Sequence, residues 1–447
     1  MRDAVVISAV LFLGFWALAN PAVGVMLWTW LSLMNPHRYA WIASELPLAL
    51  ISVAVTLAGI VLSTDRKRLP VNAVTVTLGL FVAWFCVTHQ YALYEKDAAE
   101  LLVKNLKIQF MIFITLLVLH SKAHIHTFLW VIVGSLGILG AKGGLFTLAT
   151  GGAYRVWGPP DSYIEGNNEF ALALIMLIPL IHYLAHDAEK KWLRNGLWAM
   201  IGLCAISALG SHSRGALLAI AAMTFYLWLH AKNKLPFGIA LFFMAAGMLA
   251  FMPSAWDERM STIASYEKDA SAMGRINAWW MAWNLATDRF FGGGFAIYEP
   301  AVFARYAPDP LDVHAAHSIY FQVLGEHGFI GLGLYLLVWL LTWRTANWIR
   351  RSIAEHPDME WAGRLAAMCQ VSLVGYAVGG AFLSLAYWDL PYDILVIMVL
   401  TQDWVRRELA QREAEAEATT ALDPYPPPPA VSPPPPPWPA RRPLLKD

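Results

Sequence analysis

The chain has 447 residues, of which 58% are hydrophobic and only 14% are charged. Soluble globular proteins carry about 25% charged residues, so this composition is typical of a membrane protein and argues against a soluble enzyme. The formal net charge is zero, which gives no basis for nucleic-acid binding and leaves any electrostatic function to the local placement of charge. The three cysteines match neither a disulfide framework nor a zinc motif.

Apolar runs that could cross a bilayer recur along most of the chain. A span needs about 20 mostly apolar residues. The clearest runs are 46–63, 71–89, 105–120, 124–146, 168–186, 194–210, 214–230, 235–252, 317–343, 362–386 and 391–404. Asn20-Pro21 interrupts the first 34 residues, which form either one broken span or two short helices. We therefore predict an all-α integral membrane domain over residues 1–404, with about twelve transmembrane helices.

Basic residues indicate which connections face the cytoplasm. They recur at alternate connections, as Arg66 to Arg68, Lys190 with Lys191 and Arg194, Lys232 with Lys234, and Arg344 with Arg350 and Arg351. The positive-inside rule makes these cytoplasmic, so the polar interval 253–316 is expected to be a long outward loop. Tryptophans at 279, 280 and 283 predict a short amphipathic helix within it, lying at the membrane interface. Residues 405–447 begin with a charged helical stub from Arg406 and then become Pro-rich, and we expect a cytoplasmic tail that is disordered.

Three arginines on the expected outward side are candidates for binding an anion. Arg214 lies within Ser213–Gly215, which opens a span, so it should lie at a helix N-terminus, where backbone N–H groups attract anions. Arg275 precedes the tryptophans, and Arg155 lies in a loop ahead of Asn168. Guanidinium groups match phosphate oxygens in fork geometry, so three converging arginines would hold a diphosphate. The alternative for each is a solvated charge at the interface. Ser213 and Asn168 are secondary candidates.

His317 is the candidate catalytic residue, because it lies where polar sequence becomes apolar. Its spacing from Tyr320 and Leu324 places the three on one helical face. A near-neutral imidazole can accept the proton of an attacking hydroxyl, with His314 and Tyr320 as secondary candidates. The alternatives are a structural histidine and a metal site that includes Asp312. Since a further ligand at conventional spacing and a nucleotide-binding glycine loop are both missing, we expect neither metal nor cofactor.

At these residues the chain resembles the O-antigen ligase and polymerase family of bacterial envelope enzymes. The family pattern is His, then Asn, Ser or Gln, then nine residues, then Gly-x-x-Gly. Here it reads His317-Ser318, nine residues, then Gly328–Gly331. The Ser-Arg-Gly element at 213–215 and the Gly-Arg ahead of the tryptophans agree with it. The segment Leu33–Tyr39 is similar to a subgroup described as O-glycosylation ligases, and the resemblance covers about 35–405.

The resemblance implies a GT-C-like, metal-independent glycosyltransferase of the bacterial inner membrane, with its active site facing the periplasm. Such an enzyme takes a glycan from undecaprenyl diphosphate, and the ligases of the family attach it to a sugar of the lipid A-core oligosaccharide. Membrane lipids surround both substrates. By matching position, His317 activates the acceptor hydroxyl, while Arg214 and Arg275 hold the donor diphosphate. The assignment of Arg155 to the same diphosphate is based on its sequence context and not on the resemblance. Direct attack by the hydroxyl predicts inversion at the anomeric carbon.

Three other functions stay open. An O-antigen polymerase, or a protein O-oligosaccharyltransferase, would use the same donor with a different acceptor. The Asn35–Arg38 segment favours a ligase over a polymerase, and we favour lipopolysaccharide over protein as the acceptor. From another class, a secondary transporter or lipid flippase fits the number of spans and the membrane arginines. Transporters usually bring polar groups to the bilayer midplane, whereas the polar residues here cluster at one interface.

Overall fold

The structure is a computed structural model that describes residues 1–65, 67–230, 234–235, 238 and 270–422. All regular secondary structure in these residues is helical, without strands. Residues Met1–Val405 form one compact unit, and Arg406–Asp447 form a second. The all-α integral membrane fold predicted from the sequence is confirmed.

The N-terminal 34 residues form two separate helices. The first three helices are α1 Arg2–Ala19, α2 Pro21–Met34 and α3 Leu48–Leu62. Asn20 ends α1 and caps α2, where its side chain accepts a hydrogen bond of 3.1 Å from the backbone of Ala22. Pro21 takes the first helical position, where its missing N–H leaves no bond unmade. The chain therefore forms two helices here rather than one broken span, and α1 alone is long and apolar enough to cross a membrane, whereas α2 is shorter.

The predicted spans coincide with long helices through the rest of the unit. These are α4 Ala73–His89, α5 Glu95–Val118, α6 Lys122–Ala149, α7 Asn167–Asp187, α8 Lys191–Gly210, α9 Arg214–His230, α14 Ile319–Ser352, α15 Glu360–Gly379 and α16 Asp389–Leu422. Among the described residues, seven helices are long and apolar enough to cross a membrane, and four apolar ones are shorter. The predicted span at 235–252 lies almost entirely outside the described residues, so the count of about twelve stays a prediction.

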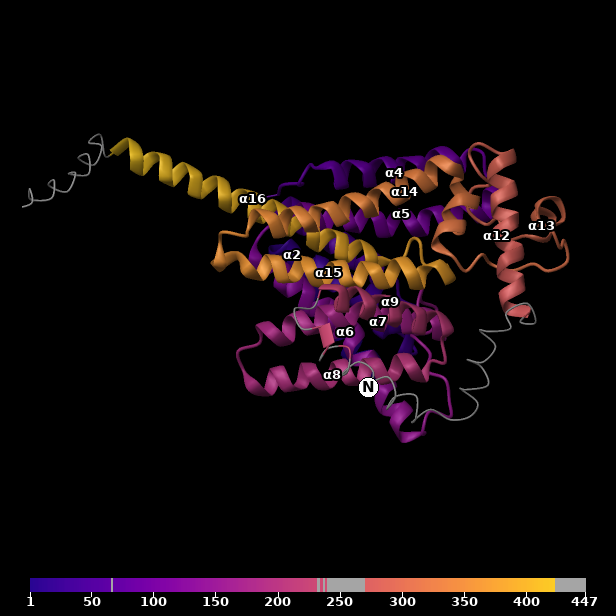
Figure 1. The fold of residues 1–447 in the computed structure, drawn as a ribbon, viewed down its shortest axis with the longest axis horizontal. Helices are drawn as coiled ribbons and strands as arrows, with labels where there is room; N and C mark the ends of the chain where they lie inside the picture. Colours follow the sequence, from indigo (N-terminus) through magenta and orange to yellow (C-terminus); the bar gives the residue numbers. More distant parts are fainter. Residues whose placement is uncertain (66, 231–233, 236–237, 239–269, 423–447) are drawn as a thin grey trace, which may run out of the picture. The chain divides into compact units, whose positions relative to one another are not determined.

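Helix α7 is buried by the helices around it, and α14 packs between α4 and α15. Helix α7 packs against α6, α8, α9 and α15, and nearly all of its residues are buried. Helix α14 packs against α4 and α15, and the three run side by side in Figure 1. The charged residues after 405 continue α16 as far as Leu422, and the Pro-rich part of the predicted tail lies outside the described residues.

The helix predicted around the tryptophans is present as α12, Ala270–Asp288, followed by the short α13, Pro300–Tyr306, and its place at a membrane interface stays a prediction. Figure 1 shows α12 lying crosswise at one end of the bundle, as a helix in the plane of a membrane interface would. One face of α12 is buried, including Met281 and Leu285, whereas Trp280 and Trp283 are exposed. The first part of the predicted loop, 253–269, lies outside the described residues.

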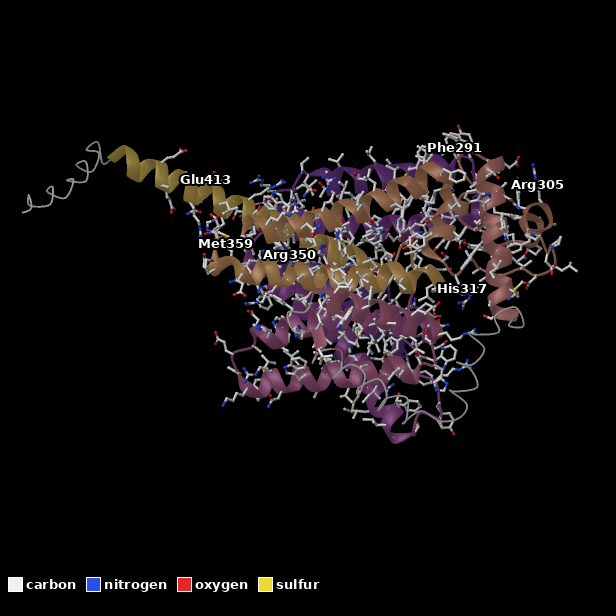
Figure 2. The ribbon with its side chains drawn as sticks, in the orientation of Figure 1. Phe291, Arg305, His317, Arg350, Met359 and Glu413 are labelled. Carbon is white, nitrogen blue, oxygen red and sulfur yellow. The ribbon has the colours of Figure 1, made fainter. Side chains whose placement is uncertain are left out.

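The two ends of the bundle carry different residues. Figure 2 shows His317 at the same end as Phe291 and Arg305, with Arg350 and Met359 at the opposite end. The basic residues that close α14 therefore lie opposite His317, which is the distribution that the positive-inside rule expects. The orientation in the membrane itself stays a prediction.

Candidate active site at the His317 end of the bundle

His317 lies in a loop directly before α14, in an unusual backbone conformation. Helix α14 begins at Ile319, with Ser318 as its extended N-cap, and His317 has a φ of +42°. The prediction that His317 shares a helical face with Tyr320 and Leu324 is wrong, because α14 begins only at Ile319, two residues after His317. Tyr320 instead donates a hydrogen bond of 2.8 Å to the carbonyl of Ala377 on α15. The imidazole Nδ1 of His317 is buried and has no hydrogen-bond partner among the described residues.

Helix α12 holds the loop that carries His317. The indole Nε1 of Trp279 donates a hydrogen bond of 2.7 Å to the carbonyl of Ala316, one residue before His317. The same indole stacks on Phe321, in the first turn of α14, with ring centroids 5.1 Å apart. Asn277 donates a second hydrogen bond of 2.9 Å to the carbonyl of Asp312. The position of His317 therefore depends on α12 as much as on α14.

Arg275 lies on α12 close to both His317 and Glu169, the latter in the first turn of α7. Burial lowers the pKa of His317 to about 4, and the nearby charges of Arg275 and then His314 act in the same direction. The imidazole is therefore neutral at pH 7, which leaves a nitrogen lone pair free to accept a proton. Three segments that are distant in sequence meet at this point.

His314 is held against α12. Its Nδ1 lies 2.7 Å from a carboxylate oxygen of Asp312. Its ring also lies on Gly274, where an added Cβ would be 2.7 Å from Nδ1, so a side chain at position 274 would displace it. Within the described ranges, no group of three or more His, Cys, Asp or Glu side chains is arranged to hold a metal ion.

Arg214 lies at the start of α9, as predicted. The hydroxyl of Ser213 accepts a hydrogen bond of 3.2 Å from the third residue of the helix, and the first turn contains no acidic residue. A Cβ on Gly215 would lie 3.6 Å from Phe382, whose ring centroid is 6.5 Å from that of Trp279. The N-terminus of α9, which favours anions, thus adjoins the aromatic contacts that hold the His317 loop.

Two other predicted residues lie elsewhere on the same end of the unit. Arg155 lines a cavity of about 250 Å³ together with Lys142 and Trp157. Asn168 lies in the first turn of α7, beside Asn167, whose side chain donates a hydrogen bond of 2.7 Å to the carbonyl of Ser211. Among the residues that the structure describes, neither Arg155 nor Asn168 has a contact that carries a role at His317, so both stay predictions.

The spacing of the His and Gly-x-x-Gly elements has a structural basis. The nine residues between Ser318 and Gly328 are a short helical segment, 319–327, which ends at a kink. Gly328 has φ +67° and ψ −173°, a backbone region that only glycine adopts readily. A Cβ at Gly328 would also collide with the carbonyl oxygen of Phe290. The membrane-spanning part of α14 therefore starts in a new direction after Gly328.

The kink frees three carbonyl groups at the end of segment 319–327, and each has a partner. The backbone N–H of Gly293 donates to the carbonyl of Gly325, and that of Gly294 donates to the carbonyl of Glu326. The indole Nε1 of Trp84 donates to the carbonyl of His327, and each of the three hydrogen bonds is 2.9 Å long. Buried helix ends need such partners, because free carbonyls there lack water. Sequence reasoning missed Trp84 and Glu169, and it missed the glycine run 292–294 although three consecutive glycines after a helix are a visible signal.

The fold and the site together define an all-helical integral membrane protein with a neutral histidine and an arginine at one end of its bundle. Residues 199–336, which include Arg214, Arg275 and His317, match the model of the O-antigen ligase family. The matched segment supports assignment of the chain to the O-antigen ligase and polymerase family, so the predicted resemblance is confirmed. Residues 1–189 match a family of unknown function, DUF5935. No curated protein matches the chain.

Proposed function

We propose that the chain is an O-antigen ligase, which transfers a glycan from undecaprenyl diphosphate to a sugar of the lipid A-core oligosaccharide on the periplasmic face of the inner membrane. The family match supports glycan transfer of the ligase or polymerase kind. The observation that carries the proposal is the buried Nδ1 of His317, which has no hydrogen-bond partner in the described part of the chain, beside the guanidinium of Arg275. That pair offers a proton acceptor and an anion-binding group at one place, as glycan transfer from a diphosphate requires.

The proposed reaction is one displacement at the anomeric carbon. The acceptor hydroxyl attacks that carbon, His317 takes the hydroxyl proton, and the bond to the diphosphate oxygen breaks. Negative charge builds on the leaving diphosphate, and Arg275 with Arg214 at the N-terminus of α9 stabilises it. The step needs no metal to balance this charge. A single displacement inverts the anomeric configuration, so a product with retained configuration would contradict the mechanism.

Donor binding also adjusts the basicity of His317. Without substrate, burial and the charge of Arg275 hold the pKa of His317 near 4, which makes it a weak base. A diphosphate on Arg275 cancels that positive charge, so the pKa of His317 rises towards the working pH. The acceptor is therefore deprotonated efficiently only after the donor has bound.

Glycan transfer in a purified system tests the proposal. The protein in lipid nanodiscs receives undecaprenyl-diphosphate glycan and lipid A-core, with EDTA present, beside His317→Ala and a control, His356→Ala, after α14. We expect the wild type and His356→Ala to form the product in the presence of EDTA. We expect His317→Ala to lose this activity. Transfer only to a second donor glycan would indicate a polymerase, and transfer only to protein would indicate a protein O-oligosaccharyltransferase. Folded protein that binds no donor would support a transporter or flippase.

A further inference from the structure

A second cavity lies at the His317 end of the unit, between α2, α5, the loop before α7 and the start of α16. Its volume is about 280 Å³, and none of His317, Arg214 and Arg275 lines it. Buried residues contribute to its wall, among them Trp388 at 1% exposure and Asp389 at 4%. The carboxylate of Asp389 accepts a hydrogen bond of 2.7 Å from the Ser32 hydroxyl. A buried carboxylate at the wall of an open cavity is costly unless it has a ligand or a structural role.

Aromatic rings form part of the cavity wall. Trp28 lines it from α2, and Tyr163 lines it from the loop before α7. The hydroxyl of Tyr163 donates a hydrogen bond of 2.7 Å to the side chain of Asn105, which fixes the ring. Lys104 places its ammonium group 4.0 Å from the centroid of the same ring. The wall thus combines flat apolar faces with a few fixed polar groups, as sites for small organic ligands commonly do.

Acidic and basic groups in the lining are balanced. The acids are Glu100, Asp161 and Asp389, and the bases are Arg38, Lys104 and Lys107. Arg38 and Asp161 already lie 3.5 Å apart. Burial and the neighbouring Arg38 lower the pKa of His37, so this ring is neutral at pH 7 and adds no charge. Carboxylates would repel a phosphate, whereas the mixed set offers acceptors and donors to an uncharged molecule with many hydroxyl groups.

We propose that this cavity binds an uncharged sugar unit of a glycan, away from the reacting bond. Hydroxyl groups of the sugar would donate to Asp389 and accept from Lys104, while its apolar face would lie on the aromatic rings. Calling this sugar part of the donor or the acceptor rests on the proposed function, but the sugar-binding site itself does not.

The cavity lies within reach of the His317 site. Tyr387, two residues before Asp389, donates a hydrogen bond of 2.5 Å to Glu326 on segment 319–327. That segment begins two residues after His317, and nine helical residues span about 14 Å. An oligosaccharide, rather than one sugar, would therefore connect the two sites. Apart from Trp388 and Asp389, the lining falls within residues 28–163, inside the segment that matches the family of unknown function.

Protection of a cysteine in the cavity tests the proposal. Ser162 lines the cavity, and Cys86 is the only exposed native cysteine in the described part, since Cys204 and Cys369 are buried. We would label Ser162→Cys in a Cys86→Ser background, in nanodiscs, with a maleimide. The probes are the source cells' lipid-linked glycan, their core lipopolysaccharide, and undecaprenyl diphosphate without glycan. Thr287→Cys, exposed on α12, is the control for general shielding.

We expect one glycan-bearing probe to slow labelling at position 162 about tenfold, without effect at position 287. Protection by the lipid-linked glycan would assign the site to the donor, and protection by core lipopolysaccharide would assign it to the acceptor. Lys104→Met should abolish the protection, whereas Lys96→Met, on the same helix outside the cavity, and His317→Ala should keep it. Protection without transfer by wild-type protein would contradict the proposed function alone. Protection by glycan-free undecaprenyl diphosphate, or by no probe, would overturn the sugar site.

Discussion

The indole of Trp279 donates a hydrogen bond of 2.7 Å to the carbonyl of Ala316, and this bond joins helix α12 to the residue before His317. Trp279→Phe removes the donor but keeps an aromatic ring for stacking on Phe321. One neutral hydrogen bond contributes about 0.5–1.5 kcal/mol, so we expect the rate of transfer to fall roughly 2- to 12-fold.

The control for this change is Trp280→Phe, because the Trp280 side chain is exposed and lies on the same helix. We expect its kcat to equal that of the wild type. Equal kcat values for the two variants, both well folded, would show that the bond to Ala316 does not position His317.

The lowered pKa of His317 predicts the pH dependence of kcat/KM, which reports ionisation in the free enzyme. Since the pKa is about 4, His317 is neutral above about pH 5 and becomes protonated only below that range. We expect no loss of kcat/KM from His317 between about pH 8 and pH 5, and a fall as the pH approaches 4. A fall centred near pH 6.5, present in the wild type and absent from the residual activity of His317→Ala, would contradict the buried environment described here.

Arg275 lowers the pKa of His317, so Arg275→Met should raise it. NMR titration of ring-labelled histidine would follow the change, with His317→Ala identifying the resonance. Arg305→Met is the control, because Arg305 pairs with Asp288 and is exposed on α13. Adding undecaprenyl diphosphate to the wild type should raise the same pKa. An unchanged pKa of His317 in Arg275→Met would contradict the proposed coupling between donor binding and activation of the acceptor.

Gly328→Ala tests the kink that ends segment 319–327. Its backbone conformation costs other residues about 1–3 kcal/mol, and the added Cβ also collides with the carbonyl of Phe290. We expect a lower melting temperature in detergent and a reduced rate of transfer. Gly333→Ala lies in the same helix with nothing within 4 Å of the added Cβ, so it should be neutral or stabilising by up to about 1 kcal/mol. Equal losses in both variants would contradict the role of the kink.

The helices could be predicted from the sequence, because a bilayer forces each apolar run to satisfy its own backbone hydrogen bonds. Pro21 marked the break between α1 and α2, and Ser213 marked the start of α9. Helix was also expected over 319–327, as part of the span 317–343, but the kink at Gly328 that ends this segment was not predicted. Its cap from Gly293 and Trp84 could not be predicted, since those residues reach it through contacts distant in sequence.

The candidate site was predicted in part. His317, Arg214 and Arg275 fall within the matched O-antigen ligase segment, and Arg275 lies close to His317. The left-handed conformation of His317 was not predicted, because it depends on bonds from α12 rather than on local sequence. Glu169 was passed over, since its proximity to Arg275 comes from packing between helices.

The rate of glycan transfer by His317→Ala, compared with its binding of undecaprenyl-diphosphate glycan, tests the central claim most directly. General-base catalysis contributes about 10²- to 10⁴-fold, so we expect a single-turnover rate lower by that factor, with donor affinity within about threefold of the wild type. The control His356→Ala should keep both values. Transfer by His317→Ala at the wild-type rate, or loss of donor binding without a specific loss of rate, would contradict the role of His317 as the base.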